Sequence, residues 1–473
     1  MKQMRYLLLT IIAAVGLTVS SCIEDDFTVS SSDLLAFSTD TLSFDTVFTD
    51  LGTPTARLKV YNRAKKSINI SSISMREPDS RFSMNVDGQS GSVFSNVEIR
   101  GEDSIFIFVE CKLPLSPDDQ PLLSRDAIVF VTNGVTQQVE LEAWGQNVTR
   151  LRDLRVSSDM RLTAERPIVV FDSLVVERGA TLRVDPGVQL LFHDKASLTV
   201  RGTLEAVGEP GRMIDMRGDR LDNVLPDVGY DILAGQWQGV TIAPESFGNR
   251  LEYVDMRSTV HGLVVDSCSD LSRKKLTIVN SWLHNSQGSA LKSKYAAVDA
   301  WGSVFSEAAG HVVELHGGIH DFSQCTFSNY YLFTAPWQSI VGLYHLLPDQ
   351  DEDTANPLMQ AQFENSIIYG MGPDINEPDL KGSSVFMRYV LLRSEGKDDD
   401  NFISCLWGAD PLFYTVREDY IFNYRVKPES PAIGAGDPAY AFPFIRYDMD
   451  GVFRLRDGKP TLGAYEYVAP PEE

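Results

Sequence analysis

The sequence predicts an all-β protein in which a β-sandwich is followed by a solenoid of stacked, strand-rich coils. Two observations predict this fold class. Apolar and polar residues alternate with period two between residues 34 and 148. From Gly239 onward, a glycine-led apolar phrase recurs at spacings of 23, 26 and 22 residues, as Gly239–Ile242, Gly262–Val265, Gly288–Leu291 and Gly310–Val313. A unit of this length cannot bury its own apolar face, whereas stacked copies share one core.

The N-terminus has the pattern of an export signal. Lys2 and Arg5 precede an apolar run from Leu7 to Val19, which at 13 residues is too short to span a bilayer and fits the core of a signal peptide. The run ends in Val19-Ser-Ser-Cys22, which resembles the lipobox of bacterial lipoproteins. That resemblance implies cleavage before Cys22 and acylation of this residue. The alternative is ordinary secretion with an unmodified cysteine.

An acidic segment follows Cys22. The residues Ile23-Glu-Asp-Asp26 resemble the export signal by which some Gram-negative bacteria place lipoproteins on the outer face of the outer membrane. A solvated tether on an anchor that faces the periplasm is the alternative. We therefore expect residues 1–21 to be a signal peptide and residues 22–33 to be a lipidated acidic tether. The protein would be held in the outer membrane by the acyl chains on Cys22 and exposed at the cell surface.

The composition excludes one class of partner. The chain has 42 Lys and Arg against 65 Asp and Glu, for a formal net charge of −23. Affinity for nucleic acid comes from clustered Lys and Arg, so no nucleic-acid partner is expected. The remaining cysteines are too few for a disulfide scaffold and too far apart for a CxxC motif, so we expect buried thiols at Cys111, Cys268, Cys325 and Cys405.

Residues 34–148 are expected to form an antiparallel β-sandwich. In Ser104–Cys111, four residues share one face: Ile105, Ile107, Val109 and Cys111. The phrases Leu42–Phe48 and Arg57–Asn62 also resemble the immunoglobulin-like domains that precede repeat domains in bacterial surface lipoproteins. This resemblance implies a spacer domain.

Residues 149–425 carry the coil repeat. Leu174 and Val176 recur as Leu198 and Val200, a shift of 24 residues, and about 24 residues make one coil of three short strands. The phrases Leu198–Leu204 and Gln236–Ile242 resemble right-handed parallel β-helix proteins of the pectate-lyase-like superfold. Residues 426–473 resemble the closing segment of extracellular β-helix proteins, which implies a C-terminal cap over the open edge of the last coil.

A second set of phrases predicts the register between coils. They begin at Leu251, Leu276, Val298, His320 and Ala361. Their third position is an inward apolar row that starts at Tyr253, and their fifth is a turn row that starts at Asp255. Cys325 and His320 fall in inward rows, so we expect both to be buried structural residues instead of a nucleophile and a metal ligand.

The second position of these phrases gives the catalytic candidates. It is an outward row that reads Glu252, Thr277, Asp299, Asp321 and Gln362. Adjacent coils lie about 4.8 Å apart, so Asp299 and Asp321 would form a coupled pair of carboxyl groups. Such a pair could share a proton, flank a glycosidic bond or hold Ca²⁺ as a cofactor. The structural alternative is a solvated acidic face.

A second outward row reads Asp266, Lys292 and Glu314. Lys292 is the candidate base of a lyase, which would take the proton next to a substrate carboxylate. Opposite charges on adjacent coils also stabilise a strand ladder, and that role suffices to explain the row.

One coil is longer than the others. From Gln324 to Asn365 is 41 residues, against 22 between the preceding coils, so we expect an insertion near residues 330–360. The insertion carries Tyr330, Tyr331, Trp337 and Tyr344. These rings could stack on sugars, or they could pin the insertion to the β-helix.

Three functions fit this sequence. The leading one is a surface lipoprotein whose β-helix binds a glycan or another surface macromolecule without catalysis. The second is a polysaccharide lyase or glycoside hydrolase that acts on a face of the β-helix, which rests on fold analogy alone. The third is a structural component of an outer-membrane complex, with an outer-membrane protein as partner.

Overall fold

The computed structural model describes residues 26–117, 120–225, 227–335, 337–344, 358–377, 380–381, 383–441 and 445–469. The chain divides into two compact units, one ending at Asn147 and one beginning at Val148. The expected signal peptide and Cys22 lie outside the described residues. Within the described ranges, no helix is long and apolar enough to cross a membrane.

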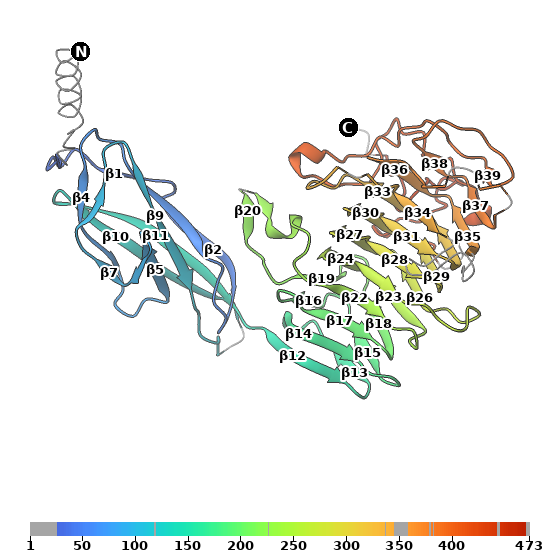
Figure 1. The fold of residues 1–473 in the computed structure, drawn as a ribbon, viewed down its shortest axis with the longest axis horizontal. Helices are drawn as coiled ribbons and strands as arrows, with labels where there is room; N and C mark the ends of the chain where they lie inside the picture. Colours follow the sequence, from blue (N-terminus) through green and yellow to red (C-terminus); the bar gives the residue numbers. More distant parts are fainter. Residues whose placement is uncertain are drawn as a thin grey trace, which may run out of the picture. The chain divides into compact units, whose positions relative to one another are not determined.

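The first unit is a sandwich of two β-sheets (Figure 1). One sheet contains, in spatial order, β1 (Leu35–Phe37), β3 (Ala56–Asn62), β9 (Ser104–Cys111), β5 (Phe82–Val86) and β6 (Gln89–Gly91). The other contains β2 (Thr41–Phe48), β11 (Val135–Gln146), β10 (Leu122–Thr132), β4 (Ile68–Met75) and β7 (Val93–Phe94), with β8 (Val97–Ile99) also on β4. Strands β3, β9 and β5 correspond to B, E and D of an immunoglobulin-like sandwich, and β11, β10 and β4 to G, F and C. The predicted sandwich is confirmed.

The residues of β9 show how this core forms. Ile107, Val109 and Cys111 are buried, whereas Phe106 and Phe108 are 37% and 39% exposed. The alternation follows from the pleat of a strand with one face toward the core. Burial raises the pKa of the Cys111 thiol to about 12, so this cysteine behaves as a small apolar residue.

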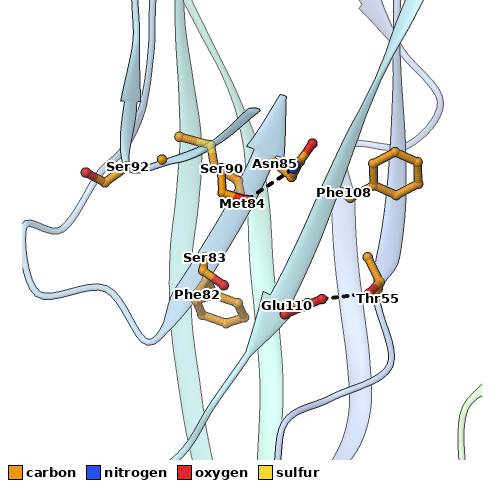
Figure 2. Close-up of a pocket in the computed structure, with 10 residues that line it drawn as sticks. Thr55, Phe82, Ser83, Met84, Asn85, Ser90, Ser92, Phe108 and Glu110 are labelled. Carbon is orange, nitrogen blue, oxygen red and sulfur yellow. Dashed lines mark hydrogen bonds between the residues drawn. The ribbon is translucent and has the colours of Figure 1, made fainter. Parts of the chain in front are cut away.

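A groove of about 720 Å³ lies along β5, β6 and β9 of the sandwich (Figure 2). Phe82, Met84 and Phe108 contribute its apolar surface. Its polar side chains pair with one another: Thr55 Oγ1 donates to Glu110 at 2.8 Å and Asn85 Nδ2 donates to Ser90 Oγ at 3.1 Å. Among the residues that line this groove, every buried polar side-chain atom therefore has a hydrogen-bond partner.

The second unit is a parallel β-helix with three faces (Figure 1). Sheet A contains β12 (Thr149–Val156), the second half of β14 (Ile168–Val176), β17 (Ser197–Val200), β22 (Gly239–Ile242), β25 (Leu263–Val265), β28 (Leu291–Lys294), β31 (Val313–His316) and β34 (Val341–Tyr344). Sheet B contains β13 (Met160–Leu162), β15 (Thr181–Val184), β18 (Thr203–Val207), β23 (Asn249–Glu252), β26 (Leu276–Val279), β29 (Ala297–Trp301), β32 (Gly318–Ser323), β35 (Leu358–Glu364), β37 (Val385–Arg388) and β39 (Phe402–Ile403).

Sheet C contains the first half of β14, β16 (Gln189–Phe192), β19 (Ile214–Gly218), β24 (Val254–Thr259), β27 (Trp282–Ser286), β30 (Val304–Ala308), β33 (Thr326–Asn329), β36 (Ile367–Gly370) and β38 (Leu391–Leu392). Strand β14 joins sheets A and C in one coil, because its two halves pair with β16 and β17. Each strand pairs in parallel with its counterpart in the next coil. The predicted fold class, an all-β chain with a sandwich followed by a parallel β-helix, is confirmed.

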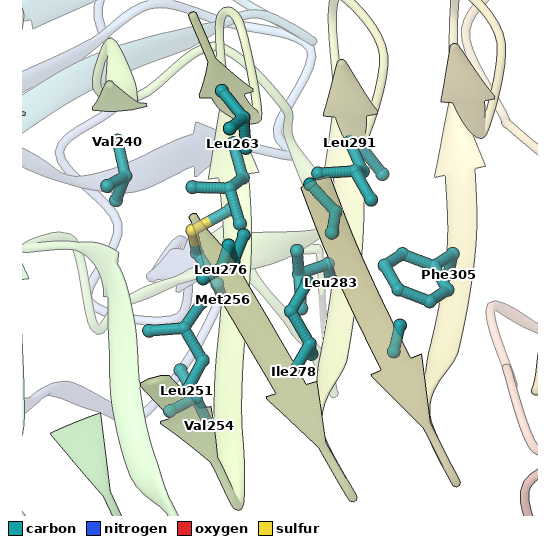
Figure 3. Packing of buried hydrophobic residues seen from close by; sticks show 14 of the residues in the cluster. Val240, Leu251, Val254, Met256, Leu263, Leu276, Ile278, Leu283, Leu291 and Phe305 are labelled. Carbon is teal, nitrogen blue, oxygen red and sulfur yellow. The ribbon is translucent and has the colours of Figure 1, made fainter. Parts of the chain in front are cut away.

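Alternate side chains of the coils fill one continuous core (Figure 3). Equivalent residues stack from coil to coil, as Val240, Leu263 and Leu291 do on sheet A. In later coils the core becomes aromatic. Phe322 stacks on Phe363 with ring centroids 5.0 Å apart, and Phe305 stacks on Phe327 at 5.5 Å.

The glycine-led phrases lie where the chain enters sheet A, and close approach of the coils requires the glycine there. A Cβ atom added to Gly239 would lie 2.2 Å from the carbonyl oxygen of Gly262. One added to Gly262 would lie 2.0 Å from the carbonyl oxygen of Ser289. Gly262 also has a φ of +68°, which side chains disfavour.

The register of the later phrases is confirmed, but that of the first is wrong by two residues. Leu251 pairs with Ile278, not with Leu276, and Arg250 takes the place predicted for Glu252. Tyr253 is therefore not in the inward row. It shares the turn row with Asn280, Gly302, Gln324 and Asn365, all of which have a φ between 44° and 61°.

The row predicted for Lys292 also needs correction. Lys292 pairs with Glu314 on one side and Val264 on the other. Asp266 lies two residues farther along the chain and binds Lys294 at 2.9 Å.

Two segments differ from their expected placement. Within the expected insertion, Val341–Tyr344 forms β34 and continues sheet A in register with β31, because its apolar alternation matches that row. The C-terminal segment contacts the turn row and not only the last coil. Asn365 Nδ2 donates to the carbonyl oxygen of Asp437 at 2.9 Å, and Asn280 Nδ2 donates to that of Tyr447 at 3.1 Å.

Candidate functional site

The two predicted carboxyl groups do lie on adjacent strands. Asp299 of β29 and Asp321 of β32 are register partners, and Asp299 is only 6% exposed. Lys274 forms an ion pair with Asp299. Burial raises the pKa of Asp299, against the opposing effect of Lys274, and burial together with the charge of Asp299 raises the pKa of Asp321. Neither residue lines the groove of the sandwich or the cleft that Asp231 and Glu307 line on sheet C.

The same face continues with a second buried carboxyl group. Arg388 donates to Glu364 at 3.2 Å and to Gln362 at 3.0 Å. Burial and the charge of Asp321 raise the pKa of Glu364 to about 7. On this face Lys274 therefore pairs with Asp299 and Arg388 pairs with Glu364, and Asp321 lies on the strand between them. Among the described residues, no group of three or more His, Cys, Asp or Glu side chains is arranged to hold a metal ion.

Lys292 belongs to a polar cluster on sheet A. Its ammonium group lies 2.8 Å from Glu314, which His316 contacts at 2.7 Å. The ring of Tyr344 stacks on His316 at 4.8 Å, and its hydroxyl lies 2.7 Å from His311 Nε2. Burial would raise the pKa of Glu314, but His316, Lys292 and Ser289 outweigh it and lower the pKa to about 2. The carboxylate thus stays ionised beside the ammonium group of Lys292.

The four aromatic candidates do not gather in one patch. Tyr331 is 4% exposed, and Arg417 donates to the backbone carbonyl groups of Tyr330 and Tyr331 at 3.1 and 3.0 Å. Tyr344 belongs to β34 and stacks on His316. Trp337 is 88% exposed, so it alone of the four projects fully into solvent.

The two residues predicted to be structural are buried. Cys325 and His320 have no exposed surface. Burial raises the pKa of the Cys325 thiol to about 12 and lowers that of His320 to about 4, so both are neutral at pH 7. His320 Nε2 lies 2.8 Å from the carbonyl oxygen of Gly317. The prediction that Cys325 and His320 are core residues is confirmed.

Sheet C carries an ion-pair network that the sequence analysis did not identify. Two outward rows meet there: Asp215 pairs with Asp255, and Arg257 pairs with His284. Arg257 lies 2.7 Å from Asp215, 2.8 Å from Asp255 and 2.9 Å from Asp231. His284 Nε2 lies 3.0 Å from Asp255. One guanidinium group thus joins three carboxylates from two strands and one loop.

The loop that carries Asp231 is held on sheet C by hydrogen bonds to its backbone. Asn285 Nδ2 donates to the carbonyl oxygens of Asp231 and Ile232 at 2.7 and 2.9 Å, and Ser258 Oγ donates to that of Asp231 at 2.7 Å. Burial would raise the pKa of Asp231, but Arg217 and Arg257 outweigh it, and the pKa lies below its usual value. Asp231 is therefore a fixed, ionised carboxylate.

A cleft of about 350 Å³ lies between this loop and the segment after the last coil. Asp227–Gly229, Asp231 and Ile232 line it on one side, and Asp419–Phe422 lines it on the other. Its floor is formed by side chains of sheet C and of the following turn: Arg257, Trp282, His284, Asn285, Glu307, Tyr331 and Leu332. Trp282 stacks on His284 at 4.2 Å, and Trp282 Nε1 donates to Ser306 Oγ at 2.8 Å. The cleft thus combines aromatic rings with fixed charges.

Glu307 is the unusual residue in this cleft. It is 3% exposed and has a φ of 43°, in the left-handed region that costs a non-glycine residue about 1–3 kcal/mol. The hydroxyl of Tyr424 donates to Glu307 Oε1, whereas Oε2 has no hydrogen-bond partner among the described residues. Burial raises the pKa of Glu307, and the Ser306 and Tyr424 hydroxyls offset this only in part. The lining of the cleft therefore includes a buried acid with one carboxyl oxygen that has no hydrogen-bond partner among the described residues.

These two carboxyl groups differ in protonation because their surroundings shift their pKa values apart. Asp231 beside two arginines is ionised, and the buried Glu307 holds its proton to higher pH. A pair of this kind is the arrangement that acid–base chemistry and selective hydrogen bonding both use. The sequence contained one signal for the site. Leu198 and Val240 are register partners 42 residues apart, so this coil is also extended by the loop that carries Asp231.

Comparison with known proteins identifies no family. Neither a protein-family model nor a curated protein matches the chain. A protein of unknown function from Porphyromonas gingivalis W83 is 11% identical over 27% of this chain and 50% of its own length, with a TM-score of 0.18. A family 123 glycoside hydrolase from Clostridium perfringens is 6% identical over 25% of this chain and 30% of its own length, also with a TM-score of 0.18. Matches this weak support no conclusion about fold or function.

Proposed function

We propose that this protein is a lipid-anchored protein of the bacterial outer membrane whose β-helix binds a glycan in the cleft on sheet C. The observation that carries the proposal is the composition of the cleft, where the rings of Trp282 and Tyr420 lie beside buried polar groups. Sugar rings combine apolar faces with many hydroxyl groups, so such a cleft offers stacking and hydrogen bonding together. The sandwich then acts as a spacer between the anchor and the binding surface.

The charges around the cleft favour a neutral glycan over an acidic one. Its lining includes the carboxylates of Asp227, Asp231 and Asp419. The guanidinium group of Arg257 also lines it but already has three carboxylate partners. A uronic acid would meet excess negative charge without a free cation, which disfavours polyuronates.

Glycan binding is tested on an array of neutral and acidic bacterial and host glycans with the purified protein. The informative variant is Tyr420→Asn, because Tyr420 is 41% exposed, lines the cleft and has a φ of 59°, which asparagine tolerates. Loss of one stacking ring is expected to weaken binding about tenfold, in line with about 1.4 kcal/mol.

The matched control for this test is Tyr414→Asn, since Tyr414 is 44% exposed but does not line the cleft. It should leave the affinity unchanged. If Trp337→Ala weakens binding and Tyr420→Asn does not, the glycan lies instead on the aromatic loop predicted from the sequence. Binding to no glycan would contradict the proposal and favour a structural role in an outer-membrane complex.

The lipid anchor is tested in cells. A Cys22→Ser variant is expected to lose labelling by radioactive palmitate and to leave the membrane fraction, because acyl chains supply the affinity for the bilayer. Digestion of intact cells with a protease should degrade the wild-type protein if it faces outward. Labelling retained in Cys22→Ser would show that this residue is not the anchor.

A further inference from the structure

The position of Glu307 in the cleft raises the question of what its buried carboxyl group does. The hydroxyl of Tyr424 donates to Oε1 of Glu307, so a purely structural contact needs only this one oxygen of the carboxyl group. A buried polar atom without a partner costs about 1–3 kcal/mol. Glu307 Oε2 is such an atom, on a residue that is 3% exposed and lines the cleft. A bound ligand would remove this cost.

The backbone at Glu307 is a second, independent observation. Ser258, Asn285 and Glu307 occupy equivalent positions in successive coils of sheet C, with φ values of 66°, 54° and 43°. From this position, Asn285 and Ser258 donate hydrogen bonds to the backbone of the loop that carries Asp231. In the next coil the same left-handed position carries a glutamate instead, and this glutamate is one of the residues that line the cleft. Strained residues of this kind cluster at functional sites.

We propose that the cleft hydrolyses a glycosidic bond of a neutral saccharide, with Glu307 as the proton donor and Asp231 as the ionised carboxylate that faces the developing positive charge. This inference rests on the proposed glycan binding at the same cleft. It assigns catalysis to a different face from the one that carries Asp299 and Asp321.

The reaction is balanced with water as the second reactant. Glu307 gives its proton to the glycosidic oxygen while the bond between that oxygen and the anomeric carbon breaks, and the electron pair of the bond stays on the oxygen. Positive charge develops on the sugar ring and is stabilised by Asp231. A water molecule then adds to the anomeric carbon and gives a proton to the ionised Glu307, which restores the acid. The products are two saccharides with one new reducing end.

Three groups besides Tyr424 influence the proton on Glu307. His284 lies on the neighbouring strand, Ser306 precedes Glu307 on β30, and Tyr330 follows at the end of β33. Burial exceeds their combined effect, so the pKa of Glu307 is above its usual value. Hydrolysis is therefore expected to decline as the pH rises through the pKa of Glu307, while binding of a neutral glycan persists.

The experiment measures binding and cleavage separately for each neutral glycan that the array retains, with 4-methylumbelliferyl glycosides of neutral sugars as additional probes. Wild-type protein is expected to produce new reducing ends. Glu307→Gln should bind within a few-fold of wild type and lose at least about 100-fold in kcat, the effect of removing a proton donor. Asp231→Asn should also lose kcat.

Glu364→Gln is the matched control, because Glu364 is a buried carboxyl group with a raised pKa on sheet B, away from the cleft lining. It should cleave like wild type. Binding without any new reducing end in the wild-type protein would overturn this inference and leave the proposed glycan binding intact. Cleavage that persists in Glu307→Gln with an unchanged pH profile would also overturn it. Absence of both binding and cleavage would contradict both proposals.

Discussion

Replacing Gly262 by alanine is expected to destabilise the β-helix by about 4 kcal/mol. The new Cβ atom would lie 2.0 Å from the carbonyl oxygen of Ser289 and 2.6 Å from that of Ala290, and both belong to the next coil. Two backbone segments would have to separate, in addition to the cost of a left-handed alanine. Chemical denaturation followed by tryptophan fluorescence measures the effect, since the chain has six tryptophans and one of them, Trp237, is buried and stacks on Phe192.

The control for this variant is Gly248→Ala. Gly248 has nearly the same φ, +71°, but a Cβ atom there would meet nothing within 4 Å. Only the conformational cost of about 1 kcal/mol should remain. Equal losses in the two variants would show that backbone conformation, and not the contact between coils, makes the repeated glycine necessary.

Arg257→Met is expected to lower the free energy of unfolding by about 3 kcal/mol at neutral pH. The Arg257 side chain is 12% exposed and forms ion pairs with three carboxylates, and breaking a buried ion pair leaves uncompensated charge. Burial would raise the pKa of Asp255, but Arg257 and His284 outweigh it and hold that pKa below its usual value. Without Arg257, burial would dominate and the pKa would rise.

This shift gives the destabilisation a defined pH dependence. In the wild-type protein, Asp255 stabilises the fold above its unfolded pKa near 4, and this stability is lost as the pH falls through the lower folded pKa. In Arg257→Met, protonation of the carboxyl groups becomes favourable to folding. The difference in free energy of unfolding between wild type and Arg257→Met should therefore shrink below about pH 4. Denaturation curves at pH 7 and pH 3.5 test this expectation.

Arg183→Met is the comparison for Arg257→Met. Arg183 also joins two carboxylates of neighbouring coils, at 2.9 Å from Glu205 and 3.3 Å from Asp159, but it is half exposed. Solvent screens such pairs, so little change is expected. A similar loss in both variants would argue against burial as the reason for the importance of Arg257.

Much of the β-helix could be predicted from the sequence because each coil repeats the same short-range requirements. Asn280, Gly302 and Asn365 mark one turn row, since asparagine and glycine accept its left-handed conformation. Tyr253 occupies the same row in an earlier coil and lacks that signature. Only one residue separates β23 from β24 there, so the alignment shifted by two positions and placed Asp255 in the turn row.

The cleft could not be predicted in the same way. Its lining comes from segments that are far apart in the sequence, including Asp231 in a loop, Glu307 in a strand and Tyr420 after the last coil. Periodicity relates equivalent residues of successive coils and says little about loops that leave the repeat. Asp299 and Asp321 can be predicted because they share one row, although the ion pairs of that face join Lys274 to Asp299 and Arg388 to Glu364.

The order of these segments along the chain has a consequence for biosynthesis. Tyr420, which lines the cleft, and Tyr424, whose hydroxyl donates to Glu307, follow the last strand of the repeat and are made after it. A chain that stops within the repeat would stack its coils but would lack one side of the cleft. Completion of the cleft is thereby delayed until the coils have been synthesised.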